Sequence, residues 1–357
     1  MYGCTFARLA TDIGKRVLVI DRRDHVGGNC YTDLRDGLHV HRYGPHIFHT
    51  SNPAVWKFVT RFGDFNSFVN SPLAVSCGEL FSLPFNMYTF HQLWGVVTPE
   101  QARAKLRDQC IDYGRPPENL EEQALALVGV DIYERLIRGY TMKQWQRDPR
   151  LLPADIIRRT PLRFTYDCNY YNDTYQGIPS DGYTSLFLNM LKGVEVRLGV
   201  DFFSDRIFWE SQARLVVYTG RIDEFFGYDH GDLEYRSLEF RDTWLETDNA
   251  QGNAVINYCD LSVPYTRKIE HRHFCPPLTP IPVTVVTEEH PVTWSREKVP
   301  YYPVNTDMNM AAYRQYRERA DAMKNYVFGG RLAEYRYYDM HAVIAAAMLK
   351  CQSIGLR

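Results

Sequence analysis

The stretch Met1–Tyr31, MYGCTFARLATDIGKRVLVIDRRDHVGGNCY, decides how the rest of the chain is interpreted. Val17–Ile20 is a short apolar, β-branched run that ends in the acidic Asp21. The preceding Cys4–Thr11 predict a helix, with Gly14 as its C-cap. A helix followed by a strand that ends in a carboxylate is typical of a βαβ unit that binds a dinucleotide, where the carboxylate accepts hydrogen bonds from a ribose.

Two adjacent glycines follow this strand, after the basic pair Arg22-Arg23. In Gly27–Asn29 they allow the backbone to approach a ligand closely, and their spacing favours a flavin dinucleotide over a nicotinamide one. A full dinucleotide fingerprint has a first strand and then G-x-G-x-x-G. Of this fingerprint only the last glycine, Gly3, is present. An ordinary αβ unit of a parallel sheet therefore remains an alternative interpretation.

Length and composition are those of a globular protein of about two domains. The chain has 357 residues, of which 45% are apolar and 24% charged, and 41 basic against 43 acidic residues give a net charge of −2. This balance gives no general attraction to nucleic acid or to a membrane surface, so neither is an expected partner. The 25 tyrosines suit sugar and nucleotide pockets, but they suit ordinary cores too.

The eight cysteines are scattered without a CxxC pair, which is typical of reduced thiols in the cytosol. The histidine pairs His39/His41 and His271/His273 have no cysteine or carboxylate partners at ligand spacing, so no metal site is expected. No apolar run reaches the roughly 20 residues of a membrane-spanning helix, and no signal peptide is visible. We therefore expect a cytoplasmic protein.

Periodicity divides the chain into three parts, which together predict an α/β fold. Capped helices fill the middle, with Thr98, Asn119 and Asp131 as predicted N-caps, and several short strands with turns follow later. Residues 1–76, 192–230 and 318–357 are assigned to a Rossmann-like FAD-binding sheet domain, 89–150 to a helical insertion domain, and 77–88, 151–191 and 231–317 to a mostly antiparallel β-sheet substrate domain.

Near the end of the chain, a strand runs into Gly329-Gly330-Arg331 and a helix begins near Asp339. The free backbone N–H groups at the start of a helix are a ready site for an anion. An aspartate at this position can equally be an N-cap. From the residues alone we place the cap first and keep the anion site as the alternative.

Ten short motifs occur in one order along the chain. They are H-V-G-G-N (25–29), Y-G-P-H-I-F-H (43–49), N-S-P-L-A (70–74), L-P-F-N-M (83–87), G-Y-T-x-K-Q-W (139–145), L-E-Y-R-S-L (233–238), G-N-A-V-I-N (252–257), P-Y-T-R-x-I-E-H (264–271), P-Y-Y-P-V-N (300–305) and F-G-G-R-L-A-E-Y-x-Y-Y-D-M-H (328–341). In these motifs, and over its whole length, the chain resembles the bacterial UDP-galactopyranose mutases.

The resemblance implies an isomerase that uses reduced FAD to interconvert UDP-galactopyranose and UDP-galactofuranose, by ring contraction through a flavin N5–sugar adduct. It also implies a homodimer that supplies galactofuranose for cell-surface glycans. The family's first strand and first glycines have no counterpart here. We expect a longer gene product to carry them, and flavin binding by this chain to be weak without them.

The resemblance assigns the site residues as well. Catalytic roles fall to two arginines at the diphosphate and one histidine at the flavin: Arg159, Arg267 and His46. The predicted substrate contacts are Asn70, Tyr140, Trp145, Tyr170, Arg236, Asn257, Tyr302 and Tyr337. The predicted cofactor contacts are Gly3, Asp21, Arg22, Gly28, Asn29, His46, Gly220, Arg331, Tyr337, Asp339 and Met340. By periodicity alone, Tyr140 belongs to the apolar stripe of a helix.

Two other functions remain open. One is an FAD-dependent oxidoreductase of the amine-oxidase-like fold, which would oxidise its substrate. The other is a flavin-less remnant that still binds UDP through Tyr140, Arg159 and Arg267. The paired arginines and the tyrosine cluster favour a nucleotide-sugar over an amine.

Overall fold

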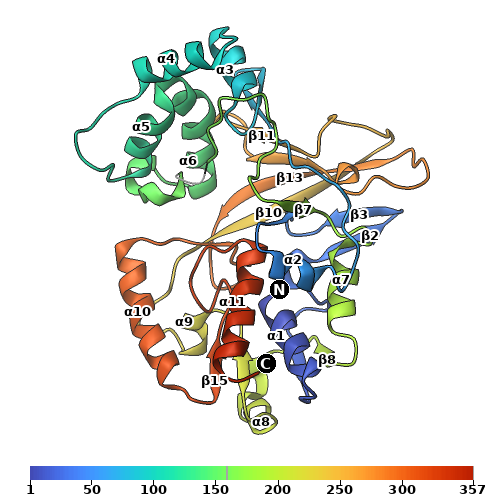
Figure 1. Cartoon of the computed structure of the whole chain (residues 1–357). Helices are drawn as coiled ribbons and strands as arrows, with labels where there is room; N and C mark the ends of the chain where they lie inside the picture. The colour runs from blue at the N-terminus through green and yellow to red at the C-terminus, as the bar shows by residue number, and fades with distance from the viewer. Residues whose placement is uncertain (158–159, 357) are drawn as a thin grey trace. The chain divides into compact units, whose positions relative to one another are not determined.

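The computed structural model describes residues 1–157 and 160–356 and divides into two compact units (Figure 1). Unit 1 consists of Met1–Ser67, Asp173–Tyr235 and Pro300–Arg357, and unit 2 of Phe68–Asn172 and Arg236–Val299. This division differs from the three predicted domains. The helical block and the antiparallel sheet share one core, which joins Ala74 and Phe81 of the sheet to helical residues such as Phe90.

Unit 1 is built from helices and short paired strands. Its helices are α1 (Tyr2–Asp12), α2 (Pro53–Val59), α7 (Gly182–Met190), α8 (Arg206–Ser211), α9 (Ile222–Phe225), α10 (Asp307–Ala322) and α11 (Met340–Ser353). Its strands are β1 (Leu18–Asp21), β2 (Thr32–Arg35), β3 (Leu38–His41), β4 (Phe48–Thr50), β7 (Tyr175–Gly177), β8 (Glu195–Leu198), β9 (Val216–Tyr218), β14 (Tyr302–Pro303) and β15 (Tyr326–Phe328). The pairs β1–β8 and β9–β15 are parallel, whereas β2–β3 and β4–β7 are antiparallel.

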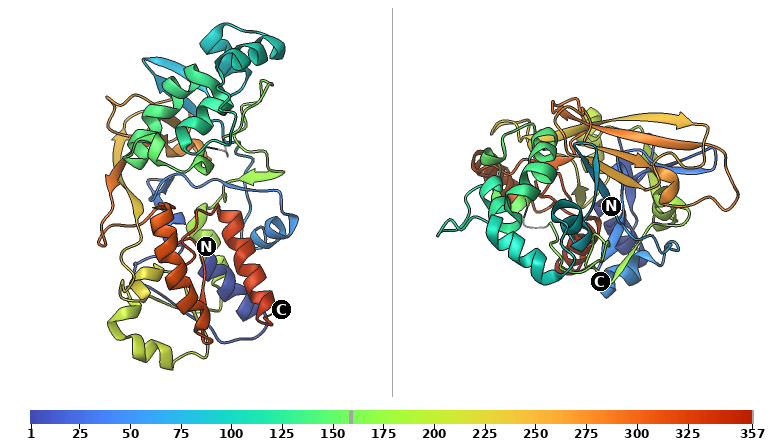
Figure 2. Two further views of the ribbon diagram at one scale, coloured as in Figure 1. Left: turned by 90° about the vertical axis from the view of Figure 1, so that its left-hand side faces the viewer. Right: turned by 90° about the horizontal axis from the view of Figure 1, so that it is seen from above.

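Helices α1 and α11 lie side by side in unit 1, as Figures 1 and 2 both show. Tyr2 and Phe6 of α1 are buried in one cluster with Val343 and Ala347 of α11. These positions recur at helical spacing on each helix, so each presents an apolar stripe to the other. The packing therefore joins the two ends of the described chain in one core.

Unit 2 joins a helical block to a sheet. The helices are α3 (Met87–Trp94), α4 (Pro99–Gln109), α5 (Leu120–Ile132), the π-helical turn η2 (Tyr133–Arg138) and α6 (Gly139–Trp145). The strands are β5 (Leu73–Ser76), β6 (Glu79–Ser82), β10 (Tyr235–Leu245), β11 (Val255–Tyr258), β12 (Arg267–Glu270) and β13 (Thr284–Thr293). They run in the order β10-β13-β12-β11-β5-β6, antiparallel throughout except for the parallel pair β11–β5.

Most predicted helix starts agree with the structure. Thr98 caps α4 through the backbone N–H of Gln101, and Asn119 caps α5 through that of Glu122. Asp131 is the predicted cap of a third helix, and α5 is indeed interrupted just before it, at Gly129 with a φ of 76°. Its side chain does not cap, however, because the carboxylate accepts a hydrogen bond from the Trp94 indole at 2.8 Å. Asp339 occupies the N-cap position of α11, but its side chain makes no capping hydrogen bond.

Strand β12 ends at Glu270, and the chain then passes into a 3₁₀ turn over His271–His273. Helix α10 was not predicted, because its exposed face carries many charges and only Tyr316 and Ala320 give it a buried stripe. None of the helices in the described part of the chain is long and apolar enough to cross a membrane.

Candidate functional site

Four polar residues, Arg236, Asn257, Arg267 and Glu289, lie on one face of the unit 2 sheet. The register pairs Arg267 with Asn257 on one side and with Glu289 on the other, and Glu289 with Phe240 on β10. Directly opposed residues share a face, and residues two or four apart along a strand return to it. Arg236, four residues before Phe240, therefore lies on the same face as the other three.

Arg267 is held by a buried carboxylate. Its Nε donates to Glu289 Oε2 at 2.8 Å, and the other Glu289 oxygen accepts from the Thr266 hydroxyl at 3.1 Å. The Glu289 side chain is 1% exposed and that of Arg267 is 20% exposed. The buried carboxylate therefore fixes the position of a guanidinium group, which is a planar donor suited to phosphate oxygens.

The predicted Tyr140 lies close to this arginine, and Tyr170 lies close to Tyr140. Burial raises the pKa of Tyr140, the charge of Arg267 opposes this, and Glu289 and Tyr170 raise it further. The Tyr140 hydroxyl is therefore protonated at neutral pH and is a donor close to the Arg267 charge. The backbone N–H of Tyr170 donates to the carbonyl of the buried Asn70 at 2.8 Å, which ties these two predicted substrate contacts together.

The short helix α6, which carries Tyr140 and Trp145, is fixed at two points. An added Cβ on Gly139 would lie 2.1 Å from the carbonyl oxygen of Cys259, so only glycine permits this approach. Lys143 Nζ donates to three carbonyl oxygens, those of Tyr258 at 2.7 Å, Val263 at 3.1 Å and Tyr265 at 2.9 Å. Trp145 packs against the unit 2 core.

Arg236 and Asn257 complete the sheet face. Arg236 is 4% exposed, and its Nε donates to the carbonyl oxygen of Gln144 in α6 at 3.2 Å. Asn257 Oδ1 is buried and accepts no hydrogen bond from the described residues. A buried acceptor without a donor costs free energy, and a ligand hydroxyl or N–H would satisfy it.

In unit 1, several residues predicted to bind the dinucleotide lie at the end of β1 or in the loop after it. Asp21 ends this strand, and its Oδ1 accepts the backbone N–H of Arg23 at 3.0 Å. The Arg23 guanidinium donates to Asn29 Oδ1 at 2.8 Å. Gly27 has a φ of 90°, and a Cβ there would lie 2.5 Å from the Phe187 ring, so the chain needs glycine to enter the turn Gly28–Cys30.

Arg331 joins two segments of unit 1 that carry predicted site tyrosines. Its Nη1 donates to the Tyr301 carbonyl at 3.1 Å, and its Nη2 donates to the Tyr338 carbonyl. The guanidinium carbon lies 5.0 Å from the centre of the Tyr337 ring. The Tyr337 and Tyr302 rings are 5.6 Å apart, so the structure brings two predicted substrate contacts together beside a cation.

His46 lies against a buried thiol. Its Nδ1 is 2.8 Å from the Gly44 carbonyl, and its backbone N–H donates to His41 Nδ1 at 3.1 Å. Burial raises the pKa of the Cys30 thiol, but the charge of His46 and a hydrogen bond to it outweigh burial, and the pKa falls to about 7. Cys30 therefore gains thiolate character beside a predicted flavin contact.

The remaining predicted residues are placed as follows. Gly3 lies in α1, Gly220 follows β9, and Met340 is the first residue of α11. Arg22 is 3.8 Å from a carboxylate oxygen of Glu224. The predicted catalytic residue Arg159 lies outside the described residues.

Sequence reasoning missed three residues that shape these sites, namely Glu289, Lys143 and Cys30. Glu289 could have been found, because it follows the apolar run Val283–Thr287 and an acidic side chain that a strand buries needs a partner. For Lys143 and Cys30 the partners are backbone carbonyls and a histidine from other segments, which no local pattern reveals.

Comparison with known proteins identifies the family. A family model of UDP-galactopyranose mutase matches residues 135–337, and a model of NAD(P)-binding Rossmann-like domains matches residues 1–62. A dTDP-fucopyranose mutase of Escherichia coli is 39% identical over 99% of this chain and 96% of its own length. A probable UDP-galactopyranose mutase of Klebsiella pneumoniae is 40% identical over 97% and 90%.

A solved structure agrees in fold. The crystal structure of a reduced UDP-galactopyranose mutase covers 99% of this chain and 92% of its own length, with a TM-score of 0.74 at 15% identity. The predicted α/β fold class, with its Rossmann-like domain, is thereby confirmed. From the family model and the two relatives, the chain belongs to the UDP-galactopyranose mutase family, whose members are flavin-dependent isomerases.

Proposed function

We propose that the chain interconverts UDP-galactopyranose and UDP-galactofuranose, using reduced FAD. The observation that carries the proposal is the sheet face of unit 2, where Arg267 lies between Glu289 and Asn257 and acts on Tyr140. A fixed cation, a protonated phenol and an unsatisfied buried acceptor on one face suit a diphosphate attached to a sugar rich in hydroxyl groups.

The residues of unit 1 fit a flavin dinucleotide. Arg23 Nη1 is buried with no hydrogen-bond partner among the described residues, and a pyrophosphate oxygen would supply one. An added Cβ on Gly28 would meet nothing within 4 Å, so the backbone is open there. Asp21, Asn29 and Arg331 are the further residues that would hold FAD. When bound and reduced, the flavin supplies the nucleophile for a ring contraction without net oxidation.

The chain's own residues then have three tasks in the reaction. Arg267 neutralises the diphosphate as negative charge develops on it, and Glu289 fixes the orientation of that arginine beforehand. The Tyr140 hydroxyl stays protonated and can donate to the departing phosphate or face the base. The buried Oδ1 of Asn257 provides an acceptor for sugar hydroxyls and the buried Arg236 provides a donor, and their burial keeps water away from the sugar.

A second substrate has specific support. The E. coli relative named dTDP-fucopyranose mutase is as similar to this chain as the K. pneumoniae relative is, and the alignment covers more of its length. Its named substrate carries the same diphosphate, so Arg267 would serve both nucleotides. We therefore place dTDP-fucopyranose second.

The cellular role is proposed on the same basis. The enzyme works in the cytoplasm as a homodimer, and its furanose product enters cell-surface glycans. These features come from the resemblance to the bacterial mutases.

The test is a direct assay. The protein is loaded with FAD, reduced with dithionite, and given UDP-galactofuranose or dTDP-fucofuranose in parallel, and the products are separated by chromatography. Arg267→Met is the matched inactive control. Formation of UDP-galactopyranose supports the first proposal, and selective turnover of the dTDP-sugar supports the second.

Three results would contradict the proposal. Flavin-loaded protein that converts neither sugar would contradict both substrates. Net oxidation of a substrate would favour the amine-oxidase-like alternative. UDP binding by a chain that takes up no flavin would favour the flavin-less alternative.

A further inference from the structure

The side chain of Lys143 ties helix α6 to the chain between β11 and β12. Its Nζ donates to the carbonyl oxygens of Tyr258 at 2.7 Å, Val263 at 3.1 Å and Tyr265 at 2.9 Å. An ammonium group has three N–H donors and no acceptor, so these three carbonyls use all of its donors. The bend of the chain between the two strands is therefore closed around one cation from α6.

The segments that Lys143 joins carry three predicted substrate contacts. Tyr140 lies three residues before Lys143 in α6. Asn257 is the last residue but one of β11, and Arg267 is the first residue of β12. One ammonium group thus fixes the helix that carries the predicted nucleotide tyrosine against the two strands that carry the predicted sugar and diphosphate contacts.

The charge of Lys143 depends on pH in the neutral to alkaline range. Burial lowers the pKa of its ammonium group to about 8, although Cys259 and Asp260, the titratable groups that act on it among the described residues, raise it. Cys259 stays a thiol in this range because burial raises its pKa to about 12, and the Asp260 carboxylate accepts the backbone N–H of Cys77 at 2.8 Å. A neutral amine has only two N–H donors, so one of the three carbonyls loses its donor when Lys143 loses its proton.

We propose that Lys143 is a positioning residue for the nucleotide-sugar, and that its protonated side chain holds Tyr140 and Arg267 in the arrangement that binds the nucleoside diphosphate. The identity of this ligand rests on the proposed function. Lys143 acts through the carbonyls that it binds and through the helix that carries it. A displacement of about 1 Å in a positioned group can cost roughly 100-fold in activity, so a loosened α6 has a large effect on the ligand.

The first experiment compares UDP affinities, measured by calorimetry at pH 7 with flavin-loaded protein that circular dichroism shows to be folded. Lys143→Met should bind UDP about 10–100-fold more weakly than wild type, and Lys143→Arg, which keeps the charge and several donors, should bind more tightly than Lys143→Met. The matched control is Lys105→Met, which removes an exposed lysine of α4 and should leave UDP affinity unchanged. If Lys143 served only folding, folded Lys143→Met would bind UDP as wild type does and only its denaturation midpoint would fall, and this result would overturn the proposal.

The second experiment needs no variant that removes the charge. If protonated Lys143 is the form that binds UDP, wild-type affinity should fall about fourfold between pH 7 and pH 8.5. Lys143→Arg should show no such fall, because a guanidinium group keeps its proton. Between pH 8 and the ordinary value of 10.5, the unfolded chain binds a proton at this lysine that the folded chain does not, so the titration of Lys143 raises the stability while it lowers UDP affinity.

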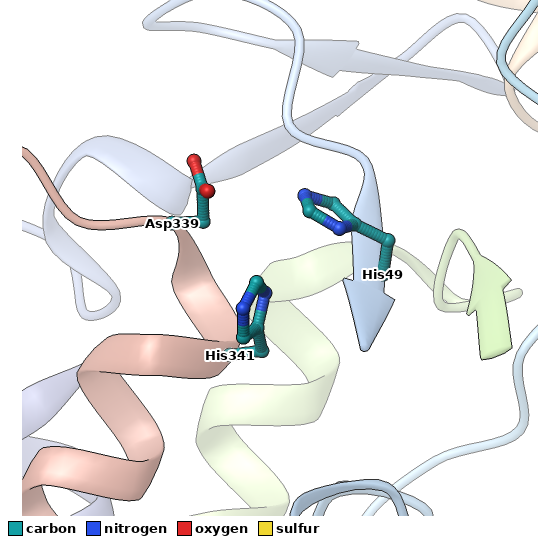
Figure 3. A group of neighbouring side chains, drawn as sticks. All are labelled: His49, Asp339 and His341. Carbon is teal, nitrogen blue, oxygen red and sulfur yellow. The ribbon is translucent and has the colours of Figure 1, made fainter. Parts of the chain in front are cut away.

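The same comparison separates Lys143 from the titratable groups of unit 1. His49, Asp339 and His341 lie together at the start of α11 (Figure 3). Burial lowers the pKa of His341, so this histidine is neutral throughout the range from pH 7 to pH 8.5. The Cys30 thiol has a pKa of about 7 and does titrate there. Since these groups are identical in wild type and Lys143→Arg, an equal fall of UDP affinity in both proteins would overturn the proposal.

Calorimetry keeps this test apart from the test of the proposed function. Wild-type protein that binds UDP but converts neither sugar would contradict the proposed reaction, while the variants of Lys143 would still decide the role of this residue. Wild-type turnover together with unchanged UDP affinity in folded Lys143→Met would contradict the role of Lys143 alone. Wild-type protein that binds neither UDP nor dTDP would overturn both.

Discussion

The candidate site residues of the two units are held by different kinds of structure. In unit 2, Arg236, Asn257 and Arg267 stand on regular strands, and the register alone places them on one face. In unit 1, Arg331 and Tyr337 lie on irregular chain and are held by hydrogen bonds to backbone carbonyls and by ring contacts. We infer that substitutions in unit 2 disturb stability and binding together, whereas substitutions in unit 1 separate the two.

The largest effect is expected from Arg267→Met. It leaves the carboxylate of Glu289 buried without its cation, which costs about 3–5 kcal/mol of unfolding free energy. Chemical denaturation measures this. The double variant Arg267→Met/Glu289→Met is the control, and it should regain most of the loss because no charge remains buried. Equal losses in the single and double variants would contradict a buried ion pair.

Acid should destabilise unit 2 through His271. This residue is 1% exposed, its Nε2 is 2.8 Å from the Thr287 hydroxyl, and burial lowers its pKa from 6.5 to about 4. Between pH 6.5 and 4 the unfolded chain binds a proton that the folded chain does not. Stability therefore falls as the pH is lowered through this window, by roughly 3 kcal/mol. Denaturation midpoints of wild type and His271→Gln at pH 7 and pH 4 measure it, and an equally steep loss in the variant would exclude His271 as the cause.

Gly139→Ala tests how tightly α6 is packed. The added methyl group would overlap the Cys259 carbonyl, so we expect a loss of about 1–3 kcal/mol together with weaker UDP binding, because Tyr140 moves with the helix. Gly3→Ala in unit 1 is the control for stability, since its Cβ would meet only Thr219 Cγ2 at 3.8 Å. If Gly139→Ala has the stability of wild type, the contact between residue 139 and the Cys259 carbonyl is less close than in the structure.

The smallest effect on stability is expected in unit 1. Tyr337→Phe retains the ring beside Arg331 and Tyr302 and removes only a hydroxyl from a residue that is 38% exposed. The unfolding free energy should stay within about 0.5 kcal/mol, while UDP affinity, measured by calorimetry, should fall several-fold if this hydroxyl contacts a phosphate. A large loss of stability here would remove the contrast between the two units.

Much of the fold could be predicted from sequence because its signals are local. The caps Thr98 and Asn119, the strand that ends at Asp21 and the glycines after it depend on residues a few positions apart. Element ends that depend on tertiary packing were missed. The carboxylate of Asp131 bonds to the indole of Trp94 instead of capping a helix, and α10 has too weak an apolar stripe for periodicity to reveal it.

The candidate site residues could be predicted mainly from the order of the ten sequence motifs, and less from hydrophobic periodicity or residue spacing. Periodicity predicts that Tyr140 is a core residue. It does pack against the unit 2 core, and its hydroxyl also lies within the electrostatic influence of Arg267. The partners that fix the site, such as Glu289 for Arg267 and three carbonyls for Lys143, come from segments far away in the sequence. Pairing of this kind appears only once the chain has folded.

The packing of α1 against α11 has a consequence for synthesis on the ribosome. Tyr2 and Phe6 emerge more than 300 residues before Val343 and Ala347, the residues that cover them. Throughout that interval α1 lacks its main packing partner, α11, although β1 and α7 are already translated, and β9 likewise lacks β15. Unit 1 can therefore close only after nearly all of the chain described here has been translated, which makes the nascent chain a natural client for chaperones that bind exposed apolar segments.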